Sequence, residues 1–251
     1  MSITIQDLLR YKSHQVQMMS DRGYLIPTEE QWLLEAHWYD NDEVHKFTNI
    51  YQNKTSPTTF RESLSQIYKH NHRDNFSIVK YLQGENNANS VSIKIIKETV
   101  SVLLNQEYCR SLTATGTVSL VIISEIPLSP VAYKKINTEF IDYDIEVIFF
   151  SMLEINPSRH CLNQPMSFMD ELDIELFKKT YHITEGHLAK RLENDIMVRH
   201  LGAKAGQYLK INRSHEQQHL PDDNSVYYAI VIPSIEADKS SKMRDVIRGV
   251  D

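Results

Sequence analysis

Apolar residues recur at helical spacing at the start of the chain, at Ile5, Leu8, Leu9, Val16 and Met19. This pattern predicts a first helix that ends near Gly23, because glycine tolerates the left-handed conformation that closes helices. A second helix is predicted from Thr28, since Thr28 and Gln31 have the spacing of a capping box. A third is predicted over residues 59–68, where apolar residues again share one helical face.

The pattern then changes to short runs of β-branched and apolar residues, which predict strands. These runs cover residues 76–82, 91–96, 99–104 and 117–123, and a short helix is predicted near residues 130–140. Clusters of glycine, asparagine and threonine between the runs supply turn chemistry. Residues 1–143 are therefore predicted to form an N-terminal domain of helices and a small sheet.

Downstream, residues 145–153 predict a further strand, and helices are predicted over residues 167–181, 184–192 and 194–201, the last closed by Gly202. Residues 207–213 and 225–232 predict paired strands joined by a polar loop. We expect residues 144–233 to form a small C-terminal α/β domain and residues 234–251 a mobile polar tail. The predicted fold class is α/β, of the α+β kind, in two domains.

The charge balance restricts the classes of function. The chain has 27 Lys+Arg against 33 Asp+Glu, a net charge of −6, which argues against a protein that binds nucleic acid alone. Its two cysteines, Cys109 and Cys161, lack a partner at metal-ligand spacing, and so few cysteines suit a reducing compartment. No signal peptide is evident and the apolar runs are far below the roughly 20 residues that span a bilayer, so we expect a soluble intracellular protein without a membrane partner.

One motif suggests an enzyme. His215, Glu216 and His219 match H-E-x-x-H, in which helical spacing puts both imidazoles on one side of a zinc ion and the glutamate acts as base. The motif lies between a predicted strand and Pro221, which leaves barely two helical turns and no long apolar face to anchor them. A solvated hairpin loop is the preferred interpretation, and a zinc peptidase is the alternative.

A basic cluster consists of His70 and His72 beside Lys69 and Arg73. A nuclease of the H-N-H type disperses its histidines and asparagine over a hairpin and a helix, so a literal tripeptide does not supply that geometry. The preferred interpretation is the basic C-terminal end of the third predicted helix, which the helix dipole favours. A minor phosphate-facing patch is the alternative.

The remaining chemistry is sparse. Trp32 and Trp38 are expected on the second helix as core or domain-packing residues, and His182 and His187 as capping or surface groups. There is no glycine-rich phosphate loop and no nucleophile arrangement with supporting spacing. We therefore expect no catalytic residue, metal, cofactor or small-molecule substrate, which favours a role in protein interaction.

Several segments, in the same order along the chain, resemble the fifth common subunit of eukaryotic nuclear RNA polymerases, whose C-terminal domain corresponds to one of the subunits of the archaeal polymerase. Asp21-Arg22-Gly23-Tyr24 looks like the turn between that family's first two helices. Residues 154–160 resemble the segment that opens its assembly domain. Most specific is the run from Asp195 through Leu201-Gly202 to Gly206, followed by a strand that begins near Lys210.

Departures from the family pattern indicate a divergent paralogue. Ile196 replaces the family's proline, Ala205 its arginine before glycine, and Ala229 the arginine of its final strand. The loop at residues 214–224 is also longer. These changes fall on side chains, whereas the glycines that define the backbone are present.

The resemblance implies a non-catalytic structural subunit of a DNA-directed RNA polymerase. It would dock on the largest polymerase subunit, contact other core subunits, and form part of the lower jaw near downstream DNA, in the nucleus, or in the nucleolus if it serves the ribosomal-RNA polymerase. Candidate partner-binding residues are Glu154, Pro157, His160, Leu201, Gly202, Lys204, Gly206 and Lys210. Candidate DNA-proximal residues, for an indirect or weak contact, are Lys69, Arg73, Lys94 and Lys97. A free-standing protein-interaction adaptor is a further alternative.

Overall fold

The computed structural model describes residues 3–52, 60–82, 91–105, 117–140, 144–183, 185–213 and 225–233. The chain divides into two compact units, with the division between Ile155 and Asn156. The predicted boundary after residue 143 is too early, because strand β4 (Asp144–Phe149) pairs with strand β3 (Thr117–Ser124) of the first unit. The predicted tail and the 214–224 loop lie outside the described residues.

The first unit opens with helical elements. These are α1 (Ile5–Asp21), the 3-10 helix η1 (Thr28–Leu34), α2 (Asn41–Gln52) and the short α3 (Phe60–Ser63). A capping box is present, but at α1, where the Thr4 side chain accepts from the Asp7 amide and the Asp7 side chain accepts from the Thr4 amide. The predicted box at Thr28 is wrong, since η1 begins after Pro27 without a side-chain cap.

The four strands of the first sheet run in the order β1-β2-β3-β4, with β1 at Gln66–Lys69 and β2 at Asn75–Tyr81. β1 pairs antiparallel with β2, whereas β2, β3 and β4 are parallel. Parallel neighbours need a crossover connection, usually a helix. Here α4 (Ile93–Asn105) lies between β2 and β3 along the chain, and α6 (Pro130–Glu139) lies between β3 and β4.

Two further predictions fail in this unit. Residues 91–96 and 99–104 were expected to form strands, but most of them belong to α4, whose side chains Ile96 and Val100 are buried one helical turn apart. A run of β-branched and apolar residues favours a strand but can also form a buried helix. Here the segment must connect two parallel strands, which favours the helix. The predicted helix at 59–68 is limited to α3, because the chain then enters β1 and pairs with β2.

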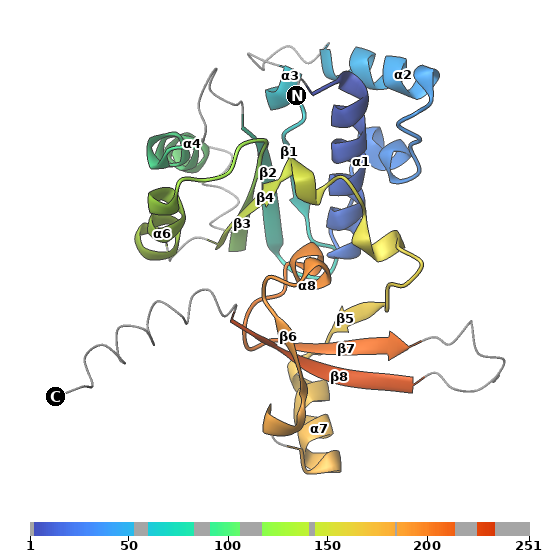
Figure 1. Ribbon diagram of the computed structural model, residues 1–251, viewed down its shortest axis with the longest axis vertical. Coiled ribbons are helices and arrows are strands. Elements are labelled where there is room, and N and C mark those ends of the chain that lie inside the picture. Colours follow the sequence, from blue (N-terminus) through green and yellow to red (C-terminus); the bar gives the residue numbers. More distant parts are fainter. Residues whose placement is uncertain are drawn as a thin grey trace. The chain divides into compact units, whose positions relative to one another are not determined.

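Helices cover both faces of the first sheet (Figure 1), with α1 on one side and α4 and α6 on the other. The strand period separates two cores accordingly. Val79, Val121 and Ile123 belong to the core that contains the buried residues of α1, whereas Ile78 and Ile122 belong to the core with Ile96 of α4. This arrangement confirms a mixed helix-and-sheet domain.

The 3-10 helix η2 (Phe150–Met152) ends the described helices of the first unit. The second unit comprises η3 (Pro157–Arg159), β5 (Met166–Phe168), α7 (Glu171–Tyr181), η4 (Glu185–His187), β6 (Ala189–Leu192), α8 (Ile196–Leu201), β7 (Tyr208–Arg213) and β8 (Ser225–Ile232). The predicted antiparallel pairing of the last two strands is confirmed. The predicted helix at 184–192 is wrong, because β6 pairs parallel with β8 at the edge of the sheet.

The second sheet, in the order β5-β7-β8-β6, also carries a helix on each face. Leu209 and Ile211 share one buried cluster with Val198 of α8. Tyr208 and Ile230 share another with Phe177 of α7. Alternate residues of β7 therefore face α8 and α7. No helix among the described residues is long and apolar enough to cross a membrane.

Candidate docking surface and basic residues

The end of helix α8 is built by the predicted Leu201-Gly202 pair. Gly202 has φ 70° and its amide donates to the Arg199 carbonyl, while the Ala203 amide reaches back to the Val198 carbonyl at 2.9 Å. This combination is a Schellman-type cap, in which a left-handed glycine satisfies the last carbonyls of a helix. Leu201 and Ala203 are buried on either side of the glycine. The Leu201 side chain therefore anchors the turn and is not itself presented to a partner.

A second turn follows immediately. The Gln207 amide donates to the Lys204 carbonyl at 3.1 Å, with Gly206 at φ 89° between them, the geometry of a turn that requires a positive φ at its third residue. The Gln207 side chain also accepts from the Lys204 amide, and the Gly206 amide donates to the Val231 carbonyl of β8. Lys204 and Ala205 are consequently held on an exposed loop of fixed backbone.

The predicted opening segment contacts α8, the helix that precedes this loop, within the second unit. Asn156 caps η3 by accepting from the Ser158 amide, Pro157 occupies the first helical position, and η3 contacts α8. His160 is exposed, and its ring nitrogen Nδ1 accepts from the Leu162 amide. The structure thus brings Pro157 to the helix that ends at Gly202. Glu154 is exposed but belongs to the first unit.

Lys210 lies apart from these residues. It is exposed on β7 between Leu209 and Ile211, which both pack toward α8, so its side chain leaves the opposite face of the sheet. The predicted partner-binding residues of the second unit therefore occupy two of its faces, and Glu154 belongs to the first unit. The turn at 201–206 and the η3 segment both adjoin α8 and together make up the candidate docking surface, and Lys210 is outside it.

A polar network that the sequence analysis did not identify holds the segment after η3. The Arg191 guanidinium donates to the Tyr227 hydroxyl at 2.6 Å, and that hydroxyl donates to the Gln164 side chain at 3.0 Å. Arg191 also forms an ion pair with Asp195, whose carboxylate caps α8 at the Met197 amide. The network joins β6, β8 and the start of α8 to the chain just before β5. Its residues are far apart in sequence, so only tertiary structure makes it visible.

The Asp21-Arg22-Gly23-Tyr24 motif forms a tight connection in the first unit. Gly23 has φ 85°, and a Cβ on it would lie 3.1 Å from the ring of His70. The Arg22 guanidinium makes a two-pronged contact with Glu146 of β4 at 2.6 and 3.0 Å. The Asn71 amide donates to the Gly23 carbonyl. The motif therefore ties α1 to the β1–β2 hairpin and to the edge strand β4.

The predicted DNA-proximal residues fall in two places. Lys69 ends β1, near the Phe76 ring, and Arg73 is exposed in the following turn, where it forms no ion pair with another described residue. Lys94 and Lys97 lie on α4, in contact with Glu98 and Glu139 respectively. The positive charge of the α4 pair is therefore largely balanced locally, whereas that of Lys69 and Arg73 is not.

The cluster His70 to Arg73 is a hairpin turn and not the end of a helix, so that preferred interpretation is wrong. Burial lowers the pKa of His70, and the neighbouring Arg73 charge lowers it further. His70 is therefore predominantly neutral at neutral pH. Its ring serves as packing for Gly23 and lies edge-on to Tyr24.

The most buried polar group of the first unit is an ion pair that the sequence analysis also missed. Lys12 of α1 and Glu30 of η1 are both fully buried, with Nζ and Oε1 2.8 Å apart. The Lys12 ammonium also donates to the Gln15 side chain and the Leu64 carbonyl. The Tyr51 and Tyr68 hydroxyls donate to the two oxygens of Glu30. One signal was available, since Lys12 sits four residues from Leu8 and Val16 on the apolar stripe of α1.

Opposing effects set the ionisation of this cluster. Burial raises the pKa of Glu30, but the Lys12 charge and the hydrogen bonds from Lys12, Tyr68 and Tyr51 outweigh it, so the pKa lies below its ordinary value. Burial and the Glu30 carboxylate raise the pKa of Tyr68 and of Tyr51. The pair therefore stays charged and the tyrosines stay neutral donors at neutral pH. Such a network fixes the positions of α1, η1, α2 and β1.

Among the described residues, no group of three or more His, Cys, Asp or Glu side chains could hold a metal ion. The H-E-x-x-H residues His215, Glu216 and His219 lie outside those ranges. Cys161 is exposed, with a free thiol.

Comparisons with known proteins agree with the resemblance. Residues 155–231 match the family described as RNA polymerase Rpb5, C-terminal domain. A relative over both units is the DNA-directed RNA polymerase V subunit 5A of Arabidopsis thaliana, which is 24% identical over 197 residues, covering 78% of this chain and 77% of that protein. The suspected resemblance is confirmed, and the low identity marks this chain as divergent.

Proposed function

From the premise that residues 155–231 form an Rpb5-type domain, we propose that this chain is a non-catalytic structural subunit of a DNA-directed RNA polymerase. Similarity to a polymerase subunit extends over most of both chains, which supports a subunit role for the whole molecule and not for the second unit alone. Its place of action would be the nucleus.

The observation that carries the proposal is the pair of glycine turns after α8. Gly202 and Gly206 both have positive φ, and together they present Lys204 and Ala205 on a short loop of fixed backbone. These glycines belong to the most specific part of the family pattern. A fixed backbone reduces the entropy lost on association, so this loop and the adjacent η3 segment are suited to docking on a larger protein.

We propose that this partner is the largest polymerase subunit and that Pro157, His160, Gly202, Lys204 and Gly206 contribute to the contact. Lys210 and Glu154 would make separate contacts, since their side chains lie on other surfaces. The second unit supports the need for a partner, because it is small and leaves several large apolar side chains exposed, among them Leu162 and Ile196.

We further propose that the first unit forms part of the lower jaw near downstream DNA. Lys69 and Arg73 are the better candidates for a phosphate contact, since Lys94 and Lys97 have acidic neighbours. With a net charge of −6, this contact would be weak and would depend on the polymerase for its position.

The test is affinity purification of a tagged full-length copy from native extract, with identification of the partners. The two largest polymerase subunits should be recovered in stoichiometric amount, and the protein should elute only with a very large complex. Recovery of a small unrelated complex would favour the adaptor alternative. A purified chain with stoichiometric zinc that is lost in His215→Ala would favour the peptidase.

A matched pair of variants locates the docking surface. Lys204→Glu changes an exposed side chain on the glycine turn and should reduce recovery of the largest subunit. Lys179→Glu changes an exposed side chain on α7 and should leave recovery unchanged. Equal recovery with both variants, with both proteins folded, would place the contact elsewhere.

A further inference from the structure

The connection between η1 and α2 exposes two aromatic side chains. Trp38 is 39% and Tyr39 66% exposed, although Leu33, a few residues earlier, is fully buried. Trp38 was expected on the second helix as a core or domain-packing residue, but it lies in this connection between η1 and α2. Exposed tryptophan and tyrosine on an ordered surface are typical of binding sites, because they supply contact area at low entropic cost.

The connection is well ordered by its own hydrogen bonds. The Asp40 amide donates to the His37 carbonyl at 2.8 Å, and the Val44 amide donates to the Asp40 carbonyl at 3.0 Å. The Asp40 carboxylate accepts from the Asp42 amide at 2.9 Å, and the Glu43 carboxylate accepts from the His37 amide. The backbone that carries the two rings is therefore defined before any partner arrives.

Neighbouring side chains also hold the Trp38 and Tyr39 rings in place. The Arg10 guanidinium of α1 lies 5.1 Å from the centre of the Trp38 ring, in a cation–π contact. The Tyr39 ring lies edge-on to Trp38 at 5.7 Å and to His37 at 5.4 Å. Arg10 occupies one side of the tryptophan, and the neighbouring tyrosine remains mostly exposed.

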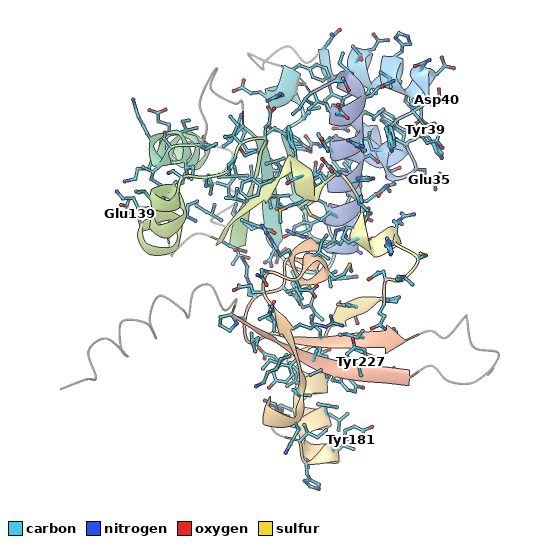
Figure 2. All side chains as sticks on the ribbon, viewed as in Figure 1. Glu35, Tyr39, Asp40, Glu139, Tyr181 and Tyr227 are labelled. Carbon is cyan, nitrogen blue, oxygen red and sulfur yellow. The ribbon has the colours of Figure 1, made fainter. Side chains whose placement is uncertain are left out.

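Carboxylates surround the aromatic pair. Figure 2 shows Glu35, Tyr39 and Asp40 close to one another along one edge of the first unit. Glu35, Asp40 and Asp42 are exposed, and none of them forms an ion pair with another residue that the structure describes. Arg10, which contacts Trp38, is itself paired with Asp7, so these three carboxylates remain available to a partner.

We infer that this surface, Glu35 to Asp42, binds a basic segment of a partner protein, with an arginine or lysine side chain set against Tyr39 and Trp38. A cation over an aromatic ring and next to carboxylates gains from both contacts. Single-stranded nucleic acid would also stack on the rings, but its phosphates would be repelled by Glu35, Asp40 and Asp42. The charge therefore selects a basic peptide. This site is separate from the glycine turn on which the proposed polymerase docking depends.

The chain offers a direct reporter of this site. It contains two tryptophans, so the full-length Trp32→Phe variant leaves Trp38 as the sole source of tryptophan emission. A short peptide in which arginine alternates with glycine is titrated into this variant. We expect a saturable change in Trp38 emission that weakens as salt is added. The same peptide with glutamine in place of arginine should produce no change.

Matched substitutions decide where the peptide binds. In the Trp32→Phe background, Tyr39→Ala and the double change Glu35→Gln with Asp40→Asn should each weaken binding by about tenfold. Glu98→Gln, an exposed carboxylate on α4, should leave it unchanged. These positions are exposed, and unchanged circular dichroism would confirm that the variants are folded.

Three results would overturn the inference: unchanged Trp38 emission on adding the peptide, equal weakening by Glu98→Gln, or preferential binding of a single-stranded oligonucleotide. Each is independent of whether the chain enters a polymerase, because the measurement uses the purified protein. Failure here would leave the proposed subunit role untouched.

Discussion

The two units bury their interiors in different ways. The first encloses a charged pair, Lys12 and Glu30, at the meeting point of α1, η1, α2 and β1. The second has two thin apolar clusters, one on each face of its sheet, and leaves Leu172 78% and Leu176 65% exposed on the outer side of α7. Both units have a sheet with helices on each face, so the difference lies in the side chains buried between helices and sheet.

This difference indicates where each unit depends on other molecules. The first unit satisfies its buried charges within itself, so its stability depends on a complete internal network. The second is less able to bury its apolar surface, which suits a domain that is completed by a larger assembly. Perturbations of the two should therefore behave differently.

The largest expected effect follows from breaking the buried pair. Lys12→Met leaves Glu30 buried without its cation and should lower the free energy of unfolding of the first unit by about 3–5 kcal/mol. Urea denaturation measures this loss, and hydrogen exchange should show faster opening of β1 and β2 with β7 and β8 unaffected. Lys94→Gln, which removes half of an exposed pair, should change stability by less than about 0.5 kcal/mol. Similar losses in the two variants would contradict the assigned role of the network.

Acid should affect the first unit before the second. The folded-state pKa of Glu30 is lowered, so its contribution is fully present above the ordinary glutamate pKa. It is lost progressively as pH falls below that value and through the folded-state pKa. The urea concentration at which β1 and β2 unfold, followed by hydrogen exchange at each pH, should therefore fall across this acidic range. In Glu30→Gln the contribution is absent at every pH, and an unchanged pH dependence in that variant would refute the assignment.

Alanine at Gly206 and at Gly23 should distinguish the cost of a positive φ from the cost of a steric clash. Gly206→Ala should cost about 1–2 kcal/mol, because its φ is 89° and an added Cβ has open space. Gly23→Ala should cost more, since it combines φ 85° with a contact of 3.1 Å to His70. Thermal unfolding measures both changes. His70→Ala in the Gly23→Ala background should recover part of the loss, and no recovery would show that crowding by His70 is unimportant.

The smallest effect is expected on the outer side of α7. Leu172→Gln with Leu176→Gln should alter the free energy of unfolding by less than about 0.5 kcal/mol for each site, because neither side chain is packed. Leu209→Ala, which removes a fully buried side chain on β7, should cost about 2–5 kcal/mol. Comparable losses for α7 and β7 would mean that the outer leucines are buried in the isolated protein.

Predictions from the sequence succeeded where local signals were sufficient. The first helix was predicted from its helical period of apolar residues, and strands β2 and β3 from runs of β-branched and apolar residues. The β7–β8 pairing was predicted from two strand-like segments joined by a polar loop. Gly202 was identified as a helix end, because only glycine readily adopts its left-handed conformation. Gly206 and Pro157 were named as candidate docking residues; the structure supplies their backbone geometry, and their role in docking stays a prediction.

The predictions failed where residues far apart in the sequence determine the structure. Residues 91–104 have a composition that suits a strand, but they cross over between parallel strands and form a helix. Residues 189–192 were expected in a helix and instead pair with β8. Trp38 was expected on a helix as a core or domain-packing residue, and it lies partly exposed in a connection. In the first two cases the local pattern allows two structures, and strand pairing far along the chain selects one.

By itself, the amino-acid sequence determined the glycine at the end of α8, the β7–β8 pair and the resemblance to a polymerase subunit, because these depend on backbone conformation and local sequence pattern. Only the tertiary structure decided which polar side chains come together. It brought Lys12 to Glu30, Arg191 to Tyr227 and Arg22 to Glu146, and it separated Lys210 from the proposed docking loop. The physical reason is that a charge is stabilised by partners in space, and its neighbours in sequence do not specify them.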